Sequence, residues 1–191
     1  MNPISSTERV RSVSSCTLAR VAGALYFFNL LAAGLLEWAF PGKMNLAAGL
    51  IELVGMTAVT LVIYQLFNAV QRNLSLLAAA FNLAGITLEA IQFGLGGTEI
   101  GMVFHGLFCM VIAFLIFRSG FLPRILAALL AFGGLAWLTY LTPRLADHLS
   151  PWNLACGLIG EALVFLWLLI MGVNEKEWKQ QGSPANAPIL S

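Results

Sequence analysis

Long apolar runs separated by short polar stretches dominate this sequence. A helix needs about 20 apolar residues to cross the hydrocarbon core of a bilayer, and six runs approach or exceed that length. They lie at residues 21–40, 46–70, 74–95, 100–117, 125–141 and 154–173. The pattern therefore predicts an all-α integral membrane bundle of six transmembrane helices.

The composition agrees with a membrane protein. The chain has 191 residues, of which 59% are apolar and only 10% are charged, whereas about a quarter of the residues in a soluble domain are charged. The three cysteines, Cys16, Cys109 and Cys156, have neither CxxC spacing nor the spacing of metal ligands. We therefore expect neither a disulfide framework nor a structural zinc site.

Polar segments flank the apolar part of the chain at both ends. Residues 1–18 are rich in Ser and Thr, and residues 174–191 follow the last apolar run. Such segments bury too little apolar surface to fold on their own. We predict disordered cytoplasmic tails at residues 1–18 and 174–191 around a transmembrane domain at residues 19–173. A polar loop is expected at residues 142–153.

The basic residues predict how the bundle is oriented. Six spans place both termini on one side, and cytoplasmic loops of membrane proteins carry an excess of Lys and Arg. Eight of the ten basic residues fall on the side of the termini, and only Lys43 and Arg144 fall on the other. We predict a multi-pass protein of the inner (plasma) membrane with both termini cytoplasmic. Four aromatic residues near the outer boundary are typical of an interfacial belt: Trp38, Trp137, Tyr140 and Trp152.

Five ionisable residues interrupt the apolar runs at one depth. They are Glu37, Glu52, Glu89, His105 and Glu161. Counted from the predicted outer end of each run, they lie within roughly 5–10 Å of the outer boundary at the rise of an α-helix. Ionisable side chains inside a membrane face the bundle interior rather than lipid. We infer an outward-opening acidic pocket in the outer half of the bundle.

The residues around this layer support an inward-facing position. Polar residues that recur at three- and four-residue spacing lie on one face of a helix. In the third run Asn82 shares the face of Glu89, and in the first run Tyr26 and Asn29 share the face of Glu37. Each stripe is expected to line the pocket.

Small residues predict where helices approach closely. Gly133 and Gly134 in the fifth run, and Gly157 and Gly160 in the sixth, leave room for a neighbouring helix. The second pair directly precedes Glu161. A helix that packs there can therefore share the hydrogen bonds of this carboxylate.

Three functions are compatible with the acidic layer. In the leading hypothesis, the pocket binds or transports a small cationic or lipid-like ligand through Glu52, Glu89 and Glu161, with His105 beside them. In the second, the same residues form a membrane-embedded acid/base enzyme, of isomerase or cyclase type, that acts on a lipid or isoprenoid. A protonated glutamate in an apolar pocket is a strong general acid. In the third, the polar layer only locks together the helices of a structural or accessory subunit.

Other chemistry has little support in the sequence. A metal site built from His105, His148 and two glutamates lacks the HxxxH or HExxH spacing, so no metal is predicted. The chain has no phosphate-cradling loop, dinucleotide fingerprint or nucleophile elbow, so no cofactor is predicted. The expected partners are membrane lipids and a small hydrophobic or cationic ligand, without nucleic acid.

Three motifs in the second half of the chain resemble a known family. They are FHGL at residues 104–107, FRSGFLPR at residues 117–124, and IGE at residues 159–161 with Trp167, Gly172 and Val173 downstream. On these motifs the chain resembles the bacterial multi-span membrane family described as domain of unknown function 4386, from the first run to the end of the sixth. The resemblance implies an all-helical integral membrane protein and brings no activity with it. The connection between the first two runs is shorter than in that family.

Overall fold

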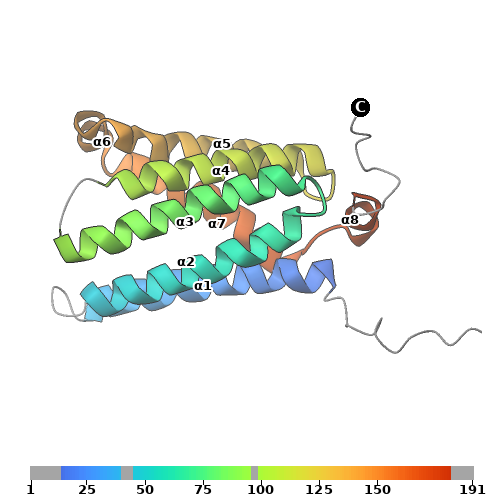
Figure 1. Cartoon of the computed structure of the whole chain (residues 1–191), viewed down its shortest axis with the longest axis horizontal. Coiled ribbons are helices and arrows are strands. Elements are labelled where there is room, and N and C mark those ends of the chain that lie inside the picture. The colour runs from blue at the N-terminus through green and yellow to red at the C-terminus, as the bar shows by residue number, and fades with distance from the viewer. Residues whose placement is uncertain (1–13, 40–44, 96–98, 182–191) are drawn as a thin grey trace, which may run out of the picture.

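Six long helices lie side by side along the molecule (Figure 1). In this computed structural model, residues 14–39, 45–95 and 99–181 are described, so Lys43 and residues 1–13 and 182–191 of the two predicted tails lie outside the described residues. The long helices are α1 (Ser15–Ala39), α2 (Asn45–Phe67), α3 (Arg72–Leu95), α4 (Ile100–Ser119), α5 (Arg124–Leu138) and α7 (Trp152–Ile170). All six are long and apolar enough to cross a membrane. The predicted all-α fold with six membrane-spanning helices is confirmed.

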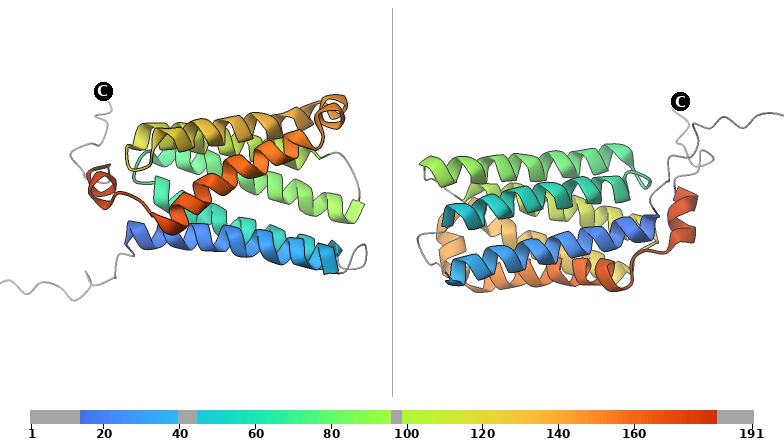
Figure 2. Two further views of the ribbon diagram at one scale, coloured as in Figure 1. Left: turned by 180° about the vertical axis from the view of Figure 1, so that it is seen from behind. Right: turned by 90° about the horizontal axis from the view of Figure 1, so that it is seen from below.

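The six helices form a closed ring. Each packs against the next along the chain, in the order α1, α2, α3, α4, α5 and α7, and α7 returns to pack against α1. Figure 2 shows α7 passing between α1 and α5, which closes the ring. At this seam the rings of Tyr26 and Phe165 stack with their centroids 4.1 Å apart. The ring therefore has an interior to which every long helix can contribute side chains.

Large apolar side chains cover the outside of the ring. Phe28, Val54, Phe132 and Ile159 are each more than half exposed, and they come from four different helices. Soluble monomers rarely expose continuous apolar surface of this extent. A lipid environment removes the cost of exposing it, so the outer faces agree with a membrane location.

Glycines bring α5 close to both of its neighbours. A Cβ atom added to Gly133 would lie 3.1 Å from the Gly157 carbonyl of α7, and one added to Gly160 would lie 2.7 Å from the Leu129 carbonyl of α5. On the opposite side of α5, Gly134 faces the backbone of Gly106 on α4. The close approach predicted from the glycine pairs is confirmed.

The two ends of the described chain meet at one end of the bundle. A short helix, α8 (Glu175–Gln181), lies beyond the end of α7, near the start of α1 (Figure 1). The structure differs here from the predicted tail, which begins at residue 174. The Trp178 indole N–H donates to the Leu66 carbonyl at 2.8 Å, and the Gln181 amide donates to the Ser119 carbonyl at 3.1 Å. These bonds hold a polar helix against the bundle although it buries little apolar surface.

The opposite end carries a second short helix where a loop was expected. A 3-10 turn, η2 (Thr139–Leu141), leads into α6 (Pro143–Leu149), which has a proline in its first turn. Proline is favoured there because the first N–H groups of a helix have no intrahelical partner. The Asn153 amide donates to the Thr139 hydroxyl at 3.2 Å and to the Ala146 carbonyl at 3.3 Å. Residues 142–153 are therefore a structured connection rather than a plain loop.

Candidate functional site

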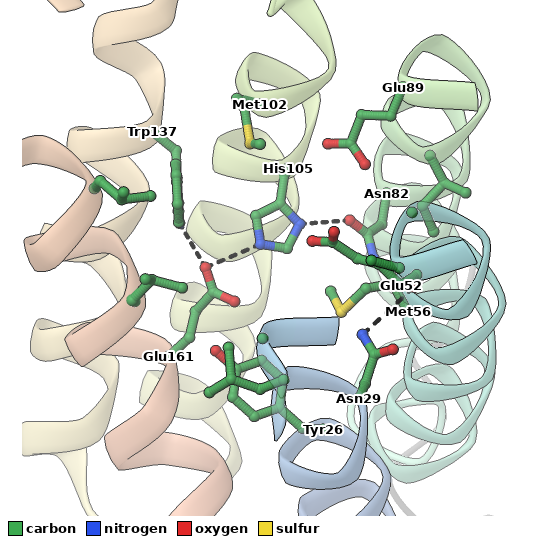
Figure 3. A pocket seen from close by; sticks show the side chains of 17 residues that line it. Tyr26, Asn29, Glu52, Met56, Asn82, Glu89, Met102, His105, Trp137 and Glu161 are labelled. Atoms are coloured by element: carbon green, nitrogen blue, oxygen red, sulfur yellow. Dashed lines mark hydrogen bonds and ion pairs between the residues drawn. The ribbon is translucent and has the colours of Figure 1, made fainter. Parts of the chain in front are cut away.

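A cavity of about 480 Å³ lies inside the ring, in the size range of small-molecule sites. It occupies the half of the bundle nearer α6, since it is lined by the later part of α1 and by the first turns of α2, α4 and α7. Each long helix contributes at least one side chain (Figure 3): Tyr26 from α1, Glu52 from α2, Glu89 from α3, His105 from α4, Trp137 from α5 and Glu161 from α7.

All four residues singled out from the sequence line this cavity. Glu52, Glu89, His105 and Glu161 come from four helices and meet around one space. Their proposed roles in binding or catalysis remain predictions. Glu37 lies in the last turns of α1, and its side chain is outside the described part of the structure.

Asn82 fixes the orientation of His105 through a chain of hydrogen bonds. The Thr60 hydroxyl donates to the Met56 carbonyl at 2.6 Å, so it can only accept from the Asn82 amide nitrogen, also at 2.6 Å. The Asn82 carbonyl oxygen therefore faces His105 Nδ1, at 2.7 Å. Because this oxygen can only accept, Nδ1 carries a proton.

Glu161 contacts the other ring nitrogen of His105 and accepts hydrogen bonds from two further residues. Its Oε1 atom lies 2.9 Å from His105 Nε2, 2.5 Å from the Trp137 indole nitrogen and 3.7 Å from Cys109 Sγ. Glu161 is only 3% exposed. Indole N–H can only donate, so Trp137 stabilises negative charge on this oxygen. The second carboxylate oxygen points toward the cavity (Figure 3).

The His105–Glu161 pair shares a single proton. Either His105 is an imidazolium beside a carboxylate, or neutral His105 accepts from a protonated Glu161, and in both cases the pair is neutral overall. A buried carboxylate needs such compensation, because an uncompensated charge in a low-dielectric interior is costly. Both ring nitrogens of His105 are occupied by this network.

Glu52 and Glu89 differ from Glu161 in their exposure and in their hydrogen bonds. Glu52 on α2 is exposed and Glu89 on α3 is partly buried, and both carboxylates project into the cavity (Figure 3). Neither carboxylate makes a hydrogen bond or ion pair within the described residues. Across these residues, the cavity lining also includes no lysine or arginine. The cavity therefore presents two acidic groups, from adjacent helices, that have no hydrogen-bond or ion-pair partner among the described residues.

Asn29 closes the wall between α1 and α2 beside Glu52. Its amide nitrogen lies 3.4 Å from the Glu52 carbonyl, and its amide oxygen is buried without a hydrogen-bond partner among the described residues. The side chain packs directly against Gly55, where a Cβ atom would collide with it. The glycine thus gives this amide its place at the edge of the cavity.

Trp137 is not the belt residue predicted from the sequence. A belt residue should be exposed, as Trp38 and Trp152 are, but Trp137 is only 3% exposed and donates to Glu161. Gly157 makes this possible, because the indole ring lies against the position where a side chain would begin. The sequence feature that could have indicated this contact is the pair of glycines before Glu161, since they predict a close neighbour for this carboxylate.

His148 does not join this cluster. It lies on α6, is exposed, and is absent from the cavity lining among the described residues. The weaker alternative of a metal site shared by His105 and His148 therefore finds no geometric support.

Comparison with known proteins agrees with the resemblance seen in the motifs. The model of the family described as "Domain of unknown function (DUF4386)" matches residues 88–172. The resemblance to DUF4386 is confirmed over this region. The matched region begins near the end of α3 and reaches past α7, so it contains Glu89, His105, Trp137 and Glu161 but not Glu52.

One relative outside the bacteria is also similar to this chain. It is an uncharacterized protein of Archaeoglobus fulgidus, 25% identical over 147 residues, and the match covers 68% of this chain and 88% of the relative. No solved structure matches the chain. Neither the matched family nor the matched relative has a description that names an activity.

Proposed function

We propose that this membrane protein binds or transports a small organic cation in the cavity between its helices. The observation that carries the proposal is a pair of carboxylates, Glu52 and Glu89, that face one cavity without an ion-pair partner among the described residues, whereas Glu161 is paired with His105. Carboxylates in an apolar bundle are costly unless something positive lies near them. A bound cation supplies that charge.

The other walls favour an organic cation over a hydrated inorganic ion. Trp137 and Tyr26 present aromatic rings, and Met56 and Met102 add polarisable apolar surface. A cation above an aromatic face gains about 0.5–2 kcal/mol, most when it is desolvated. A ligand with a positive centre and an apolar body, including a lipid-like amine, fits both kinds of wall.

The hydrogen-bond network weighs against an enzyme that uses His105 as its base. Both ring nitrogens are occupied by Asn82 and Glu161, so the ring has no free position for a ligand proton. The same network favours a structural contribution, since Thr60, Asn82, His105, Glu161 and Trp137 connect five helices. We assign helix locking to this network and ligand binding to Glu52 and Glu89.

The orientation of the bundle in the membrane is part of the same proposal. Arg20, Arg72, Arg118 and Arg124 lie at the α8 end of the bundle, and Arg144 lies on α6 at the other end. The excess of basic residues on cytoplasmic surfaces supports a cytoplasmic α8 end in the inner (plasma) membrane. The cavity would then lie in the outer half of the bundle and open outward.

A pair of isosteric ligands tests the proposed function. Benzyltrimethylammonium and neopentylbenzene have nearly the same shape, but only the first is charged. We expect the purified protein in detergent to bind the cation saturably and at least about ten-fold more tightly than the neutral compound, because ten-fold corresponds to about 1.4 kcal/mol. Equal affinities for the two compounds would rule out charge recognition.

A further inference from the structure

Three different metal-ligating side chains cluster beside the cavity: His105 and Glu161 line it, and Cys109 lies fully buried behind them. His105 and Cys109 are one helical turn apart on α4, and Glu161 faces them from α7. One ligand atom from each lies within 4.8 Å of the other two. An i, i+4 pair on one helix face, completed by a residue from a second helix, is an arrangement used by metal sites.

Two of the three ligand-atom separations can be compared with those of a tetrahedral site. Zinc binds sulfur at about 2.3 Å and nitrogen or oxygen at about 2.0–2.2 Å, which places neighbouring ligand atoms about 3.4–3.6 Å apart. The Cys109–Glu161 distance is 3.7 Å, and the His105–Glu161 distance is 2.9 Å. A modest opening of the histidine–glutamate pair therefore makes room for the ion.

The groups behind the ligands are those that metal sites use for orientation. A metal-binding histidine commonly donates its other N–H to an oxygen, which fixes the tautomer. His105 Nδ1 donates to Asn82 in this way and leaves Nε2 facing Glu161 and Cys109. Trp137 similarly donates to the Glu161 carboxylate. Both supports are in place without rearrangement.

The charge of the completed site suits an apolar bundle. One divalent ion displaces the proton shared by His105 and Glu161 and the thiol proton of Cys109. The ion then binds one neutral imidazole, one carboxylate and one thiolate, and two protons leave. The resulting complex is neutral, which avoids the cost of burying net charge.

We propose that His105, Cys109 and Glu161 form a binding site for a zinc-like divalent transition metal, with a fourth position open toward the cavity. Mixed nitrogen, sulfur and oxygen ligands suit Zn²⁺, and three protein ligands with an open position are typical of catalytic rather than structural zinc. The sequence pattern predicted no metal, because it lacks HxxxH and HExxH spacing. The metal site uses neither Glu52 nor Glu89 and therefore does not depend on the proposed cation site.

Cobalt substitution tests the metal site directly. Co²⁺ occupies zinc sites and gives an intense charge-transfer absorption when a thiolate binds it. The parent protein for the test is C16S/C156S, in which Cys109 is the remaining cysteine. After treatment with a chelator, it should bind one equivalent of Co²⁺ with a thiolate charge-transfer band, and added Zn²⁺ should abolish that band.

The variant C16S/C156S/C109S supplies the decisive comparison. Serine is nearly isosteric with cysteine, so helix content and elution volume should match the parent. We expect the thiolate band to disappear and the affinity for Zn²⁺, measured by competition with a chelating dye, to fall at least ten-fold. Absence of the band in the parent, or unchanged Zn²⁺ affinity in a folded C109S variant, would overturn the proposal.

Discussion

At the scale of single residues, the three carboxylates of the site differ in the hydrogen-bond partners that surround them. One oxygen of almost fully buried Glu161 has three hydrogen-bond partners, His105, Cys109 and Trp137, whereas the carboxylates of Glu52 and Glu89 have none among the described residues. Identical side chains thus have different roles because their surroundings differ. Our proposal rests on this contrast: it assigns helix locking to the network around Glu161 and ligand binding to Glu52 and Glu89.

Trp137 allows the structural half of this division to be tested. The W137F variant keeps an aromatic ring but removes the N–H that donates to buried Glu161. We expect the free energy of unfolding to fall by about 1–3 kcal/mol, because a buried acceptor loses a charge-assisted bond. Unfolding in a denaturing detergent measures the change. The matched control W152F alters an indole that is 73% exposed and should leave stability unchanged. Equal stability of both variants would show that the bond contributes little.

The sequence could predict the ionisable residues of the site but not all of their partners. Glu52, Glu89, His105 and Glu161 stand out because each interrupts an apolar run. Trp137 and Cys109 do not stand out, since a tryptophan near a membrane boundary and an isolated cysteine both have common structural explanations. Their roles depend on which helices are neighbours, and only the three-dimensional structure shows this.

At the scale of the helices, glycines determine which surfaces can meet. Gly133 and Gly134 face opposite neighbours, so α5 packs tightly between α7 and α4. This arrangement carries Trp137 to Glu161 and brings His105 to the same point. The glycine pairs were visible in the sequence, and the close approach was predicted from them. The partner of each pair was not, because a small-residue surface does not identify the helix that fills it.

The two short helices show where periodicity gives too little information. Both α6 and α8 have seven residues, which is about two turns. Helices this short have little stability without tertiary contacts. A bond from Asn153 to the Ala146 carbonyl holds α6, and a bond from Trp178 to the distant Leu66 carbonyl holds α8. Such side-chain bonds leave no periodic pattern in the sequence.

The charge on α8 also reflects its contacts. A hydrogen bond from the Ser14 hydroxyl, with a smaller contribution from Lys179, lowers the pKa of the Glu175 carboxyl. The hydrogen bond joins the residue before α1 to the first residue of α8. It therefore links the two ends of the described chain while Glu175 is ionised.

At the scale of the whole molecule, the ring has two chemically different ends. The α8 end carries most of the basic residues within the described chain, and the half nearer α6 contains the cavity. Six spans and the basic residues could be predicted from the sequence. The closure of the ring by α7 could not, because it depends on packing between helices that are far apart in the chain.

Site-directed labelling tests the orientation. In a C16S/C156S background, where Cys109 is fully buried, single cysteines are placed at Arg72 and at Arg144. An impermeant thiol reagent applied to intact cells should label R144C and not R72C, and both should react after the membrane is opened. Labelling of R72C alone would reverse the orientation and place the cavity in the cytoplasmic half.

We propose above that Glu52 and Glu89 make the cavity a cation site. The most direct measurement compares benzyltrimethylammonium binding by the wild type, E52Q/E89Q, and the control E99Q/D147N, which removes the same charge from two exposed positions at the α6 end. We predict that E52Q/E89Q binds the cation at least about ten-fold more weakly, a loss of about 1.4 kcal/mol, and that the control binds like the wild type. Wild-type affinity in a folded E52Q/E89Q protein would contradict the account.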